Sequence, residues 1–440
     1  MINHFLYTQL GRGRTAIARL LHQRVNQEIG LVLAGHGLRL LLGLISSAIL
    51  ARALGPEGLR VFALIGTLRT IAGTVADFGL QRSAIRHIVG NLAGEPALAF
   101  QTTAAYSRFK LMSALLMTGV LFAFAGPIAQ LLKLSEPLGV ILGAVLLLTT
   151  ALTAIVSTLL QALRRFGALI IVQSANIGLT VIFTAVLWQL GSLTVFWAIG
   201  VGSITAVASA LIGYYLLTPD WRQALQQKPR ADKTAQRQLL SFSKWLWISA
   251  LMTILTVQLD LLLVNYWLAP VLVGIYALAR NLIAKVDILT QTLHIVLLPN
   301  VSALDSPQAY RLFIRQTLKR GLLLAALILP LLPLARPFIL FVYGPAFSDA
   351  VNIFYALMIV ALFDLVISPL FLLVLPLNVP HLMALADGVQ IILLIVFSQL
   401  FIPHWGPYGI IAAKFLARLL GGGVLALLIK RRLLPGVGER

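Results

Sequence analysis

The chain has 440 residues, of which 59% are apolar and only 11% are charged. An average soluble domain is about 25% charged, so these charges are too few to cover a water-facing surface, which excludes a soluble enzyme and a disordered chain. The absence of cysteine rules out a disulfide scaffold and thiol chemistry. Apolar runs of about twenty residues, without the alternation of a transmembrane β-barrel, predict an all-α polytopic membrane protein.

About twelve transmembrane helices can be placed, since each span needs roughly 20 apolar residues. In chain order, the predicted spans are 30–52, 61–90, 103–126, 138–162, 168–190, 194–217, 243–268, 272–300, 312–334, 350–375, 381–402 and 407–430. Turn residues support these boundaries, because Gly55-Pro56 follows the first span and Gly344-Pro345 precedes the tenth. Residues 15–28 are expected to form a short basic helix on the inner membrane surface.

The basic residues indicate the orientation of these spans. With the N-terminus in the cytoplasm, six of the 34 basic residues fall within spans and most of the others fall in cytoplasmic segments. The segments on the outer side hold only Arg52, Arg60, Lys133 and Arg336. This distribution follows the positive-inside rule. It predicts a multi-pass protein of the bacterial cytoplasmic (inner) membrane with both termini in the cytoplasm, and the net charge of +20 then needs no nucleic-acid partner.

A weak internal repeat divides the chain into halves. Leu54-Gly55-Pro56 returns as Leu268-Ala269-Pro270, and Phe183 returns as Phe397, at one constant offset. An even number of spans separates the copies, which predicts a parallel repeat of two six-helix lobes around a central cavity. The expected parts are a basic cytoplasmic or interfacial N-terminus (1–28), an N-lobe (29–217), a cytoplasmic inter-lobe loop (218–241), a C-lobe (242–432) and a cytoplasmic tail (433–440).

Short motifs carry a family resemblance. Residues 50–58 (LARALGPEG), 76–80 (ADFGL) and 342–347 (VYGPAF) resemble those of bacterial polysaccharide flippases of the O-antigen translocase type, in the multidrug/oligosaccharidyl-lipid/polysaccharide exporter superfamily. The resemblance covers essentially the whole chain in span number and lobe division. Arg60 departs from the pattern, because many relatives carry a small residue at that position, and no role can be carried over to it.

The resemblance implies a flippase and not an enzyme. Its substrate would be a polyprenyl-pyrophosphate-linked oligosaccharide, an O-antigen or exopolysaccharide repeat unit, moved from the cytoplasmic to the periplasmic leaflet by alternating access. Implied partners are membrane lipids and a glycan polymerase or assembly machinery. The sequence has no G-x-x-x-x-G-K-[ST] nucleotide loop and no metal-ligand spacing among its histidines. We therefore expect no cofactor and no metal, with an H⁺ or Na⁺ gradient or product removal driving transport.

Basic residues within spans are the substrate-binding candidates. A cation facing lipid costs about 2.5–3.5 kcal/mol, whereas a pyrophosphate crossing the membrane needs cations around it. The candidates for pyrophosphate binding are Arg39, Arg69, Arg280 and Lys414. The candidates for ion pairs or ion coupling are the in-span acids Asp77, Asp260, Asp287 and Asp364.

Structural interpretations compete with these roles. Arg280 and Asp287 are two helical turns apart on one stripe, so Arg280 could instead form an ion pair with Asp287. Lys414 and Arg418 could pack against Asp364 or Asp387. The aromatic residues of the seventh span, usually interfacial anchors, could alternatively stack on sugars; they are Trp245, Trp247, Tyr266 and Trp267.

Two alternative functions remain within the same superfamily. A multidrug or organic-cation exporter should carry acids in its first two spans, whereas here Arg39 and Arg69 precede the single acid Asp77, which favours an anionic cargo. A lipid II-type flippase is disfavoured because that branch usually has fourteen spans.

Overall fold

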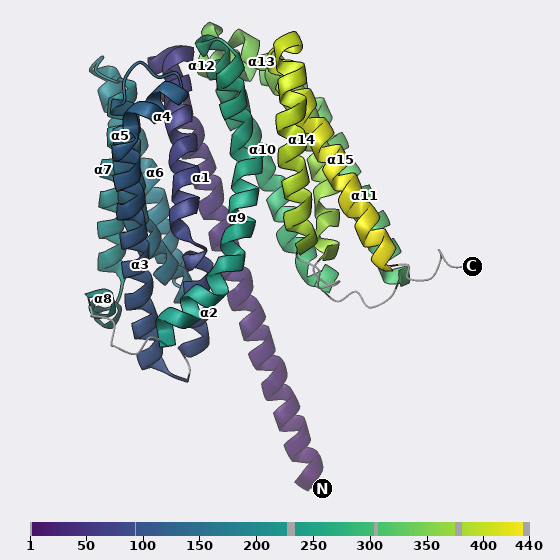
Figure 1. Cartoon of the computed structure of the whole chain (residues 1–440). Helices are drawn as coiled ribbons and strands as arrows, with labels where there is room; N and C mark the ends of the chain where they lie inside the picture. The colour runs from purple at the N-terminus through teal and green to yellow at the C-terminus, as the bar shows by residue number, and fades with distance from the viewer. Residues whose placement is uncertain (1, 93, 227–233, 303–306, 375–380, 434–440) are drawn as a thin grey trace.

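The computed structural model describes residues 2–92, 94–226, 234–302, 307–374 and 381–433, and every regular element in these ranges is a helix (Figure 1). The α-helices are α1 (Ile2–Asp77), α2 (Leu80–Asn91), α3 (Pro96–Ala123), α4 (Ala125–Leu131), α5 (Leu138–Ala162), α6 (Phe166–Gln189), α7 (Val195–Leu216), α8 (Pro219–Gln226), α9 (Thr234–Trp267), α10 (Pro270–Ser302), α11 (Pro307–Ile328), α12 (Ala335–Tyr343), α13 (Ser348–Ile367), α14 (His381–Trp405) and α15 (Pro407–Leu433). The 3₁₀ segments are η1 (Leu329–Leu334), η2 (Pro345–Phe347) and η3 (Ser368–Val374). The prediction of an all-α membrane protein is confirmed.

The chain reverses its direction within α1, at Gly55 and Pro56. Gly55 has a φ of 63° and a ψ of −175°, which is not helical, and Pro56 follows it. A side chain at this φ would be strained, so glycine permits the turn. The two arms of α1, which carry the first two predicted spans, run side by side in opposite directions (Figure 1).

The second predicted span, 61–90, is wrong at its end. The helix stops at Asp77, and Phe78 and Gly79 take positive φ values of 48° and 69°. The separate helix α2 then continues to Asn91. The apolar pattern runs through this corner, so hydropathy alone did not reveal it. The predicted inter-lobe loop, 218–241, likewise contains α8 and the start of α9.

The number of spans depends on how broken helices are counted. In the described part of the chain, nine helices are long and apolar enough to cross a membrane, or ten if the bent pair α3 and α4 forms one span. One of the nine, Ala34–Asp77, has 44 residues and contains both arms of α1. Helix α10, which carries Arg280, Lys285 and Asp287, is not among them. The twelve predicted spans include both arms of α1 and also α10.

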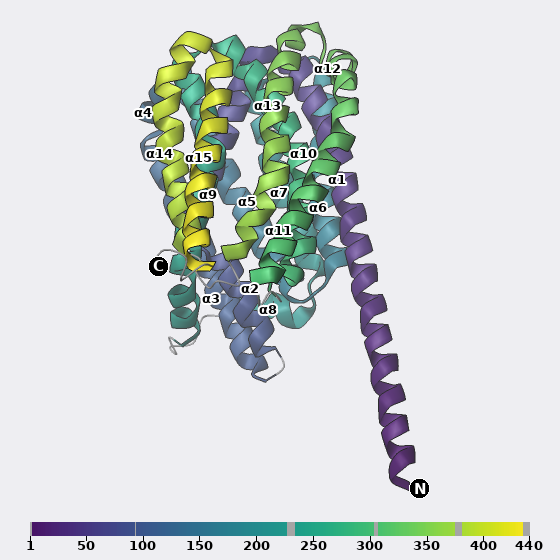
Figure 2. The same cartoon turned by 90° about the vertical axis from the view of Figure 1, so that its right-hand side faces the viewer.

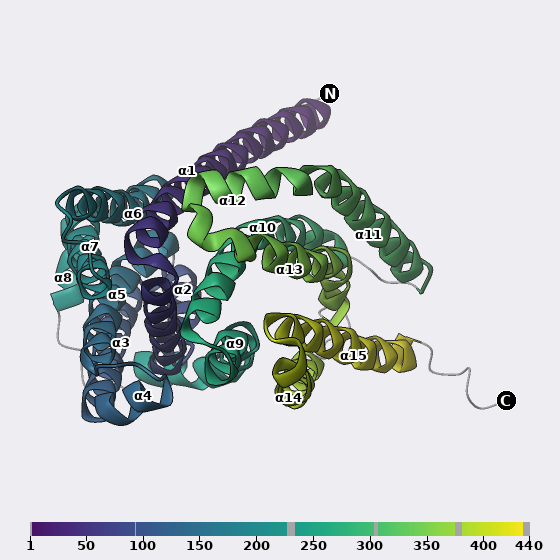
Figure 3. The same cartoon turned by 90° about the horizontal axis from the view of Figure 1, so that it is seen from above.

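The helices form two groups with α9 between them. Seen from above, α1 to α8 lie on one side and α10 to α15 on the other, except that α12 reaches across to α1 and the beginning of α1 extends past α12 (Figure 3). The helices before α9 and those after it thus fall into separate groups, and α9 follows the predicted inter-lobe loop. The predicted repeat remains a prediction, although both of its proline motifs stand at helix breaks.

The first and the last described helices share one end of the bundle. Helix α1 begins and α15 ends opposite the Gly55 turn (Figure 1). The first residues of α1 continue the helix in line and extend well beyond the bundle (Figure 2). Residues 15–28 are therefore part of α1 and not a separate short helix. Their expected location at the inner membrane surface stays a prediction.

Contacts between the two groups concentrate at the end that contains Gly55. Arg52 donates hydrogen bonds to the carbonyl oxygens of Phe341 and Val342 at the end of α12, the latter at 2.9 Å. The hydroxyls of Ser47 and Tyr343 lie 3.0 Å apart. Helix α10 approaches so closely that a methyl group on Gly274 would lie 1.8 Å from the carbonyl oxygen of Pro56. These contacts hold the two groups of helices together at this end.

Candidate functional site

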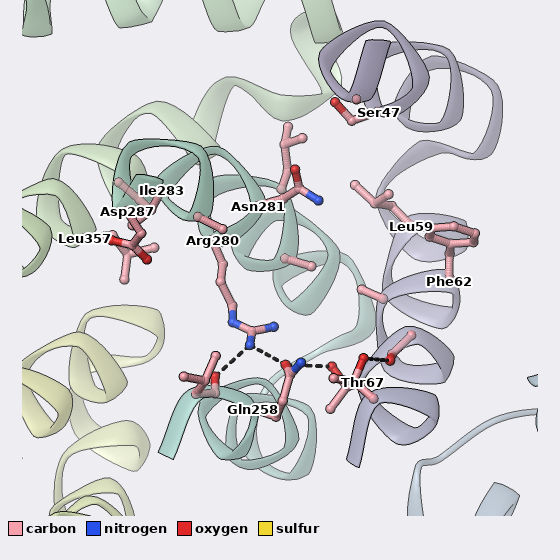
Figure 4. Close-up of a pocket in the computed structure, with 18 of the residues that line it drawn as sticks. Ser47, Leu59, Phe62, Thr67, Gln258, Arg280, Asn281, Ile283, Asp287 and Leu357 are labelled. Atoms are coloured by element: carbon pink, nitrogen blue, oxygen red, sulfur yellow. Dashed lines mark hydrogen bonds between the residues drawn. The ribbon is translucent and has the colours of Figure 1, made fainter. Parts of the chain in front are cut away.

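A central cavity of about 700 Å³ lies between the two groups of helices. Residues of α1, α5, α6 and α7 line one side, and residues of α9, α10, α13, α14 and α15 line the other. The ionisable residues in its wall are Arg69, Arg280, Asp287, Asp364, Lys414 and Arg418. Figure 4 shows the part of this wall where α1, α9 and α10 meet.

Asp260 of α9 stands directly behind two of these cations. Its side chain is fully buried, and its oxygens lie 3.1 Å from Nε of Arg280 and 2.8 Å from Nζ of Lys414. The hydroxyl of Tyr276 donates to the same carboxylate at 3.0 Å, and the backbone N–H of Leu261 donates at 2.7 Å. A buried carboxylate is stable only when it is paired and hydrogen-bonded in this way. The cluster joins α9, α10 and α15 and leaves one excess positive charge facing the cavity.

Arg280 also belongs to a hydrogen-bond chain that reaches α1. Its Nη2 donates to the carbonyl oxygen of Val257 at 2.7 Å and to Oε1 of Gln258 at 2.5 Å. The hydroxyl of Thr67 donates to the same oxygen of Gln258 at 3.4 Å (Figure 4). Nη1 of Arg280 has no hydrogen-bond partner among the described residues, so part of its donor fork remains available to a ligand.

A second ion pair lies on the same side of the cavity. Nε of Arg418 in α15 is 2.7 Å from Oδ1 of Asp364 in α13, and its Nη1 donates to Gln390 in α14 at 2.8 Å. Asp287 lies within electrostatic range of Arg418, Lys414 and Asp364. It makes no hydrogen bond or ion pair with any described residue.

Arg69 is the unpaired cation of the wall formed by α1. Its side chain is half-buried and lines the cavity, and no described residue forms an ion pair or hydrogen bond with it. Burial of a cation in a membrane protein without a counter-ion is costly. The cavity water or an anionic ligand must therefore solvate this guanidinium.

The remaining candidates lie outside the cavity wall. Arg39 donates to Gln173 of α6 and, at 3.2 Å, to the carbonyl oxygen of Gly35. Asp77, at the end of α1, forms an ion pair with Lys110 of α3. Arg39 therefore does not meet Arg69 and Arg280 in one cavity, because the part of α1 that carries it packs on α6.

The competing ion-pair interpretations are resolved by these contacts. Arg280 pairs with Asp260, so the alternative pairing with Asp287 is wrong. Arg280 and Asp287 both face the cavity from α10, but Asp260 of α9 is the carboxylate that lies within ion-pair distance of Arg280. The expected packing of Arg418 against Asp364 is confirmed. Lys414 instead pairs with Asp260.

Among the aromatic residues of the seventh span, Trp247, Tyr266 and Trp267 do not line the cavity. The ring of Trp247 stacks on Phe78 at a centroid distance of 4.9 Å, and its Nε1 donates to the carbonyl oxygen of Val75. Tyr266 and Trp267 pack edge to face. The side chain of Trp245 lies outside the described residues.

Sequence reasoning missed two arginines at the Gly55 end. Arg60 is only 6% exposed, and it donates to Asn265 at 2.8 Å and to the carbonyl oxygens of Leu132 and Lys133 at 2.9 Å. Arg52 binds the end of α12. Arg52 had been counted only as a charge of an outer segment, and Arg60 had been noted as a departure from the family pattern without an assigned role. The position of Arg60 shortly after the Gly55-Pro56 turn was the sequence feature that could have indicated its role.

The comparison with protein families identifies the chain. Residues 25–305, more than half of the sequence, match the family model described as "Polysaccharide biosynthesis protein". The chain belongs to this family. A comparison with curated proteins gives no match.

Solved structures with a similar fold are membrane transporters and a flippase. An inward-facing multidrug resistance MATE family transporter of the MOP superfamily aligns with a TM-score of 0.69 at 14% identity, over 90% of this chain and 94% of the other. The lipid II flippase MurJ, in an inward closed conformation, aligns with a TM-score of 0.68 at 17% identity, over 91% and 87%. A MOP superfamily transporter from Pyrococcus furiosus aligns with a TM-score of 0.59 at 14% identity, over 92% and 94%. This family member therefore has the fold of that superfamily.

Proposed function

We propose that this polysaccharide biosynthesis protein is a flippase for a polyprenyl-pyrophosphate-linked oligosaccharide. It would move the substrate from the cytoplasmic to the periplasmic leaflet of the inner membrane, with both termini in the cytoplasm. The family supports a role in polysaccharide export. The observation that carries the proposal is the cavity wall, where Arg69 lacks a counter-ion among the described residues and Arg280 and Lys414 share the single carboxylate of Asp260.

The charges of the cavity suit a pyrophosphate. Arg69 and the Asp260 cluster lie in opposite groups of helices, so one anion could contact both. The free Nη1 of Arg280 and the two remaining ammonium protons of Lys414 can donate to phosphate oxygens without breaking their bonds to Asp260. An anion that contacts both groups of helices would favour the conformation in which the two groups lie close together. Alternating access requires a substrate to shift the conformational equilibrium in this way.

The test of this function is glycan export with Arg69→Ala. We expect surface display of the glycan to fall at least tenfold, while the amount of protein in the membrane stays unchanged, because no ion pair is broken. Arg82→Ala, a change of the same kind at an exposed position outside the cavity, should export normally. Normal export by Arg69→Ala would contradict the proposed role of the cavity.

The organic-cation exporter remains a second candidate because of Asp287. This carboxylate lines the cavity without an ion-pair partner among the described residues, and it could attract a cationic drug. If the chain is an exporter of that kind, Asp287→Asn should raise ethidium accumulation in cells, whereas Arg69→Ala should not. We expect neither variant to change ethidium accumulation.

A further inference from the structure

The two sides of the central cavity differ in chemistry. The side formed by α10, α13 and α15 holds Asp287 and the two groups of ion-paired residues around Asp260 and Asp364. The side formed by α1, α6 and α7 carries hydroxyl and amide groups and the single charge of Arg69. A ligand with one charged part and one uncharged polar part would therefore fit this cavity in one orientation.

Some of the neutral groups have hydrogen-bonding capacity to spare. The hydroxyl of Ser46 and the side-chain amide of Asn281 line the cavity and bond to no described residue. Asn176 uses its Nδ2 to donate to Ser209 at 3.1 Å, but its Oδ1 accepts no hydrogen bond from the described residues. Although Asn281 belongs to α10, Figure 4 shows it on the side of that helix that faces α1, near Ser47.

These free groups include acceptors that a pyrophosphate cannot use. The side-chain carbonyl oxygens of Asn176 and Asn281 accept hydrogen bonds, whereas an ionised phosphate has no hydrogen to donate. Their ligand must present donors as well as acceptors, as the hydroxyl groups of a sugar do. Leu59 and Phe62 also line the cavity, on the part of α1 that faces Asn281 (Figure 4). They offer an apolar surface to the C–H face of a sugar ring.

We propose that Ser46, Asn176 and Asn281 form a subsite for the uncharged sugar attached directly to the pyrophosphate. This inference rests on the proposed function. The pyrophosphate would lie between Arg69 and the Asp260 cluster, and its first sugar would turn toward α1 and α6. A bound ligand covers these amides, and one that lacks the hydroxyl groups would leave them unpaired, so recognition at this position favours a sugar.

The test compares two soluble probes by calorimetry on the purified full-length protein. One probe is a short-chain prenyl pyrophosphate, and the other is the same molecule carrying one neutral N-acetylhexosamine. We expect the sugar to raise the affinity of the wild-type protein about tenfold, which corresponds to one or two net hydrogen bonds. Asn281→Leu should abolish this gain and leave the affinity for the sugar-free probe unchanged.

Matched variants make the outcome specific. Asn352→Leu makes the same change at an exposed position of α13 outside the cavity wall and should keep the gain. Ser46→Ala provides a second test that removes only one oxygen. Equal affinity of the wild-type protein for both probes would overturn the subsite but leave the proposed function intact, provided that Arg69→Ala still weakens the sugar-free probe. Failure of the wild-type protein to bind either probe would overturn both.

Discussion

Asp260 shows how one residue can organise a binding surface without lining it. Its carboxylate is fully buried and holds Arg280 and Lys414 at the cavity wall. Removal of one member of a buried ion cluster leaves the others uncompensated, which costs about 3–5 kcal/mol. We therefore predict that Asp260→Asn strongly lowers the thermal unfolding temperature of the detergent-purified protein.

A double variant tests whether the stability lost in Asp260→Asn comes from the uncompensated charge of its partners. In Asp260→Asn with Lys414→Met, the amide faces one cation in place of two, so the loss of stability should be smaller than in Asp260→Asn alone. Equal or greater destabilisation of the double variant would show that the ion pair itself does not stabilise the fold. Arg39→Met, outside this cluster, should not rescue Asp260→Asn.

At the scale of elements, the close contact between α1 and α10 depends on Gly274. A methyl group there would lie 1.8 Å from the carbonyl oxygen of Pro56, so Gly274→Ala must push the two helices apart. Overpacking of this kind costs about 1–3 kcal/mol. We predict a lower thermal unfolding temperature for Gly274→Ala. The control is Gly200→Ala on α7, where no atom lies within 4 Å of the added methyl group, and its unfolding temperature should stay unchanged. Similar unfolding temperatures for the two variants would show that α1 and α10 are not in close contact at Gly274.

The helices were largely predictable, but their corners were not. Long apolar runs required helices because a membrane leaves no other partner for the backbone, and the predicted span 138–162 coincides with α5. The turn at Gly55 was visible in the Gly-Pro pair. The corner at Phe78 and Gly79 was hidden, because the apolar pattern continues through it while the backbone takes positive φ values.

For the whole molecule, the orientation in the membrane is the first testable property. The chain has no cysteine, so single cysteines report accessibility without background. We predict that Ser192→Cys reacts with a membrane-impermeant maleimide in intact cells, whereas Gln226→Cys reacts only after permeabilisation. Both positions are exposed: Ser192 lies just beyond α6, and Gln226 is the last residue of α8. The reverse labelling pattern would overturn the predicted cytoplasmic location of both termini.

The composition of the candidate site was only partly predictable from the sequence. The membrane environment singled out the in-span charges, and Arg69, Arg280 and Lys414 do line one cavity. Their partners could not be inferred, because pairing depends on tertiary contacts: Asp260 meets a lysine 154 residues later in the chain. For the same reason Arg39 was grouped with the cavity, although its guanidinium bonds to α6.

The central claim is that the cationic cavity carries a pyrophosphate-linked glycan across the membrane. The most direct measurement follows a fluorescent short-chain prenyl-pyrophosphate oligosaccharide in proteoliposomes that contain the purified protein. We predict that wild-type protein moves the lipid between leaflets, that Arg69→Ala does not, and that Arg82→Ala behaves as wild type. Transport of the lipid at equal rates by wild-type protein and Arg69→Ala, or no transport of it by wild-type protein that does move an organic cation, would contradict the account.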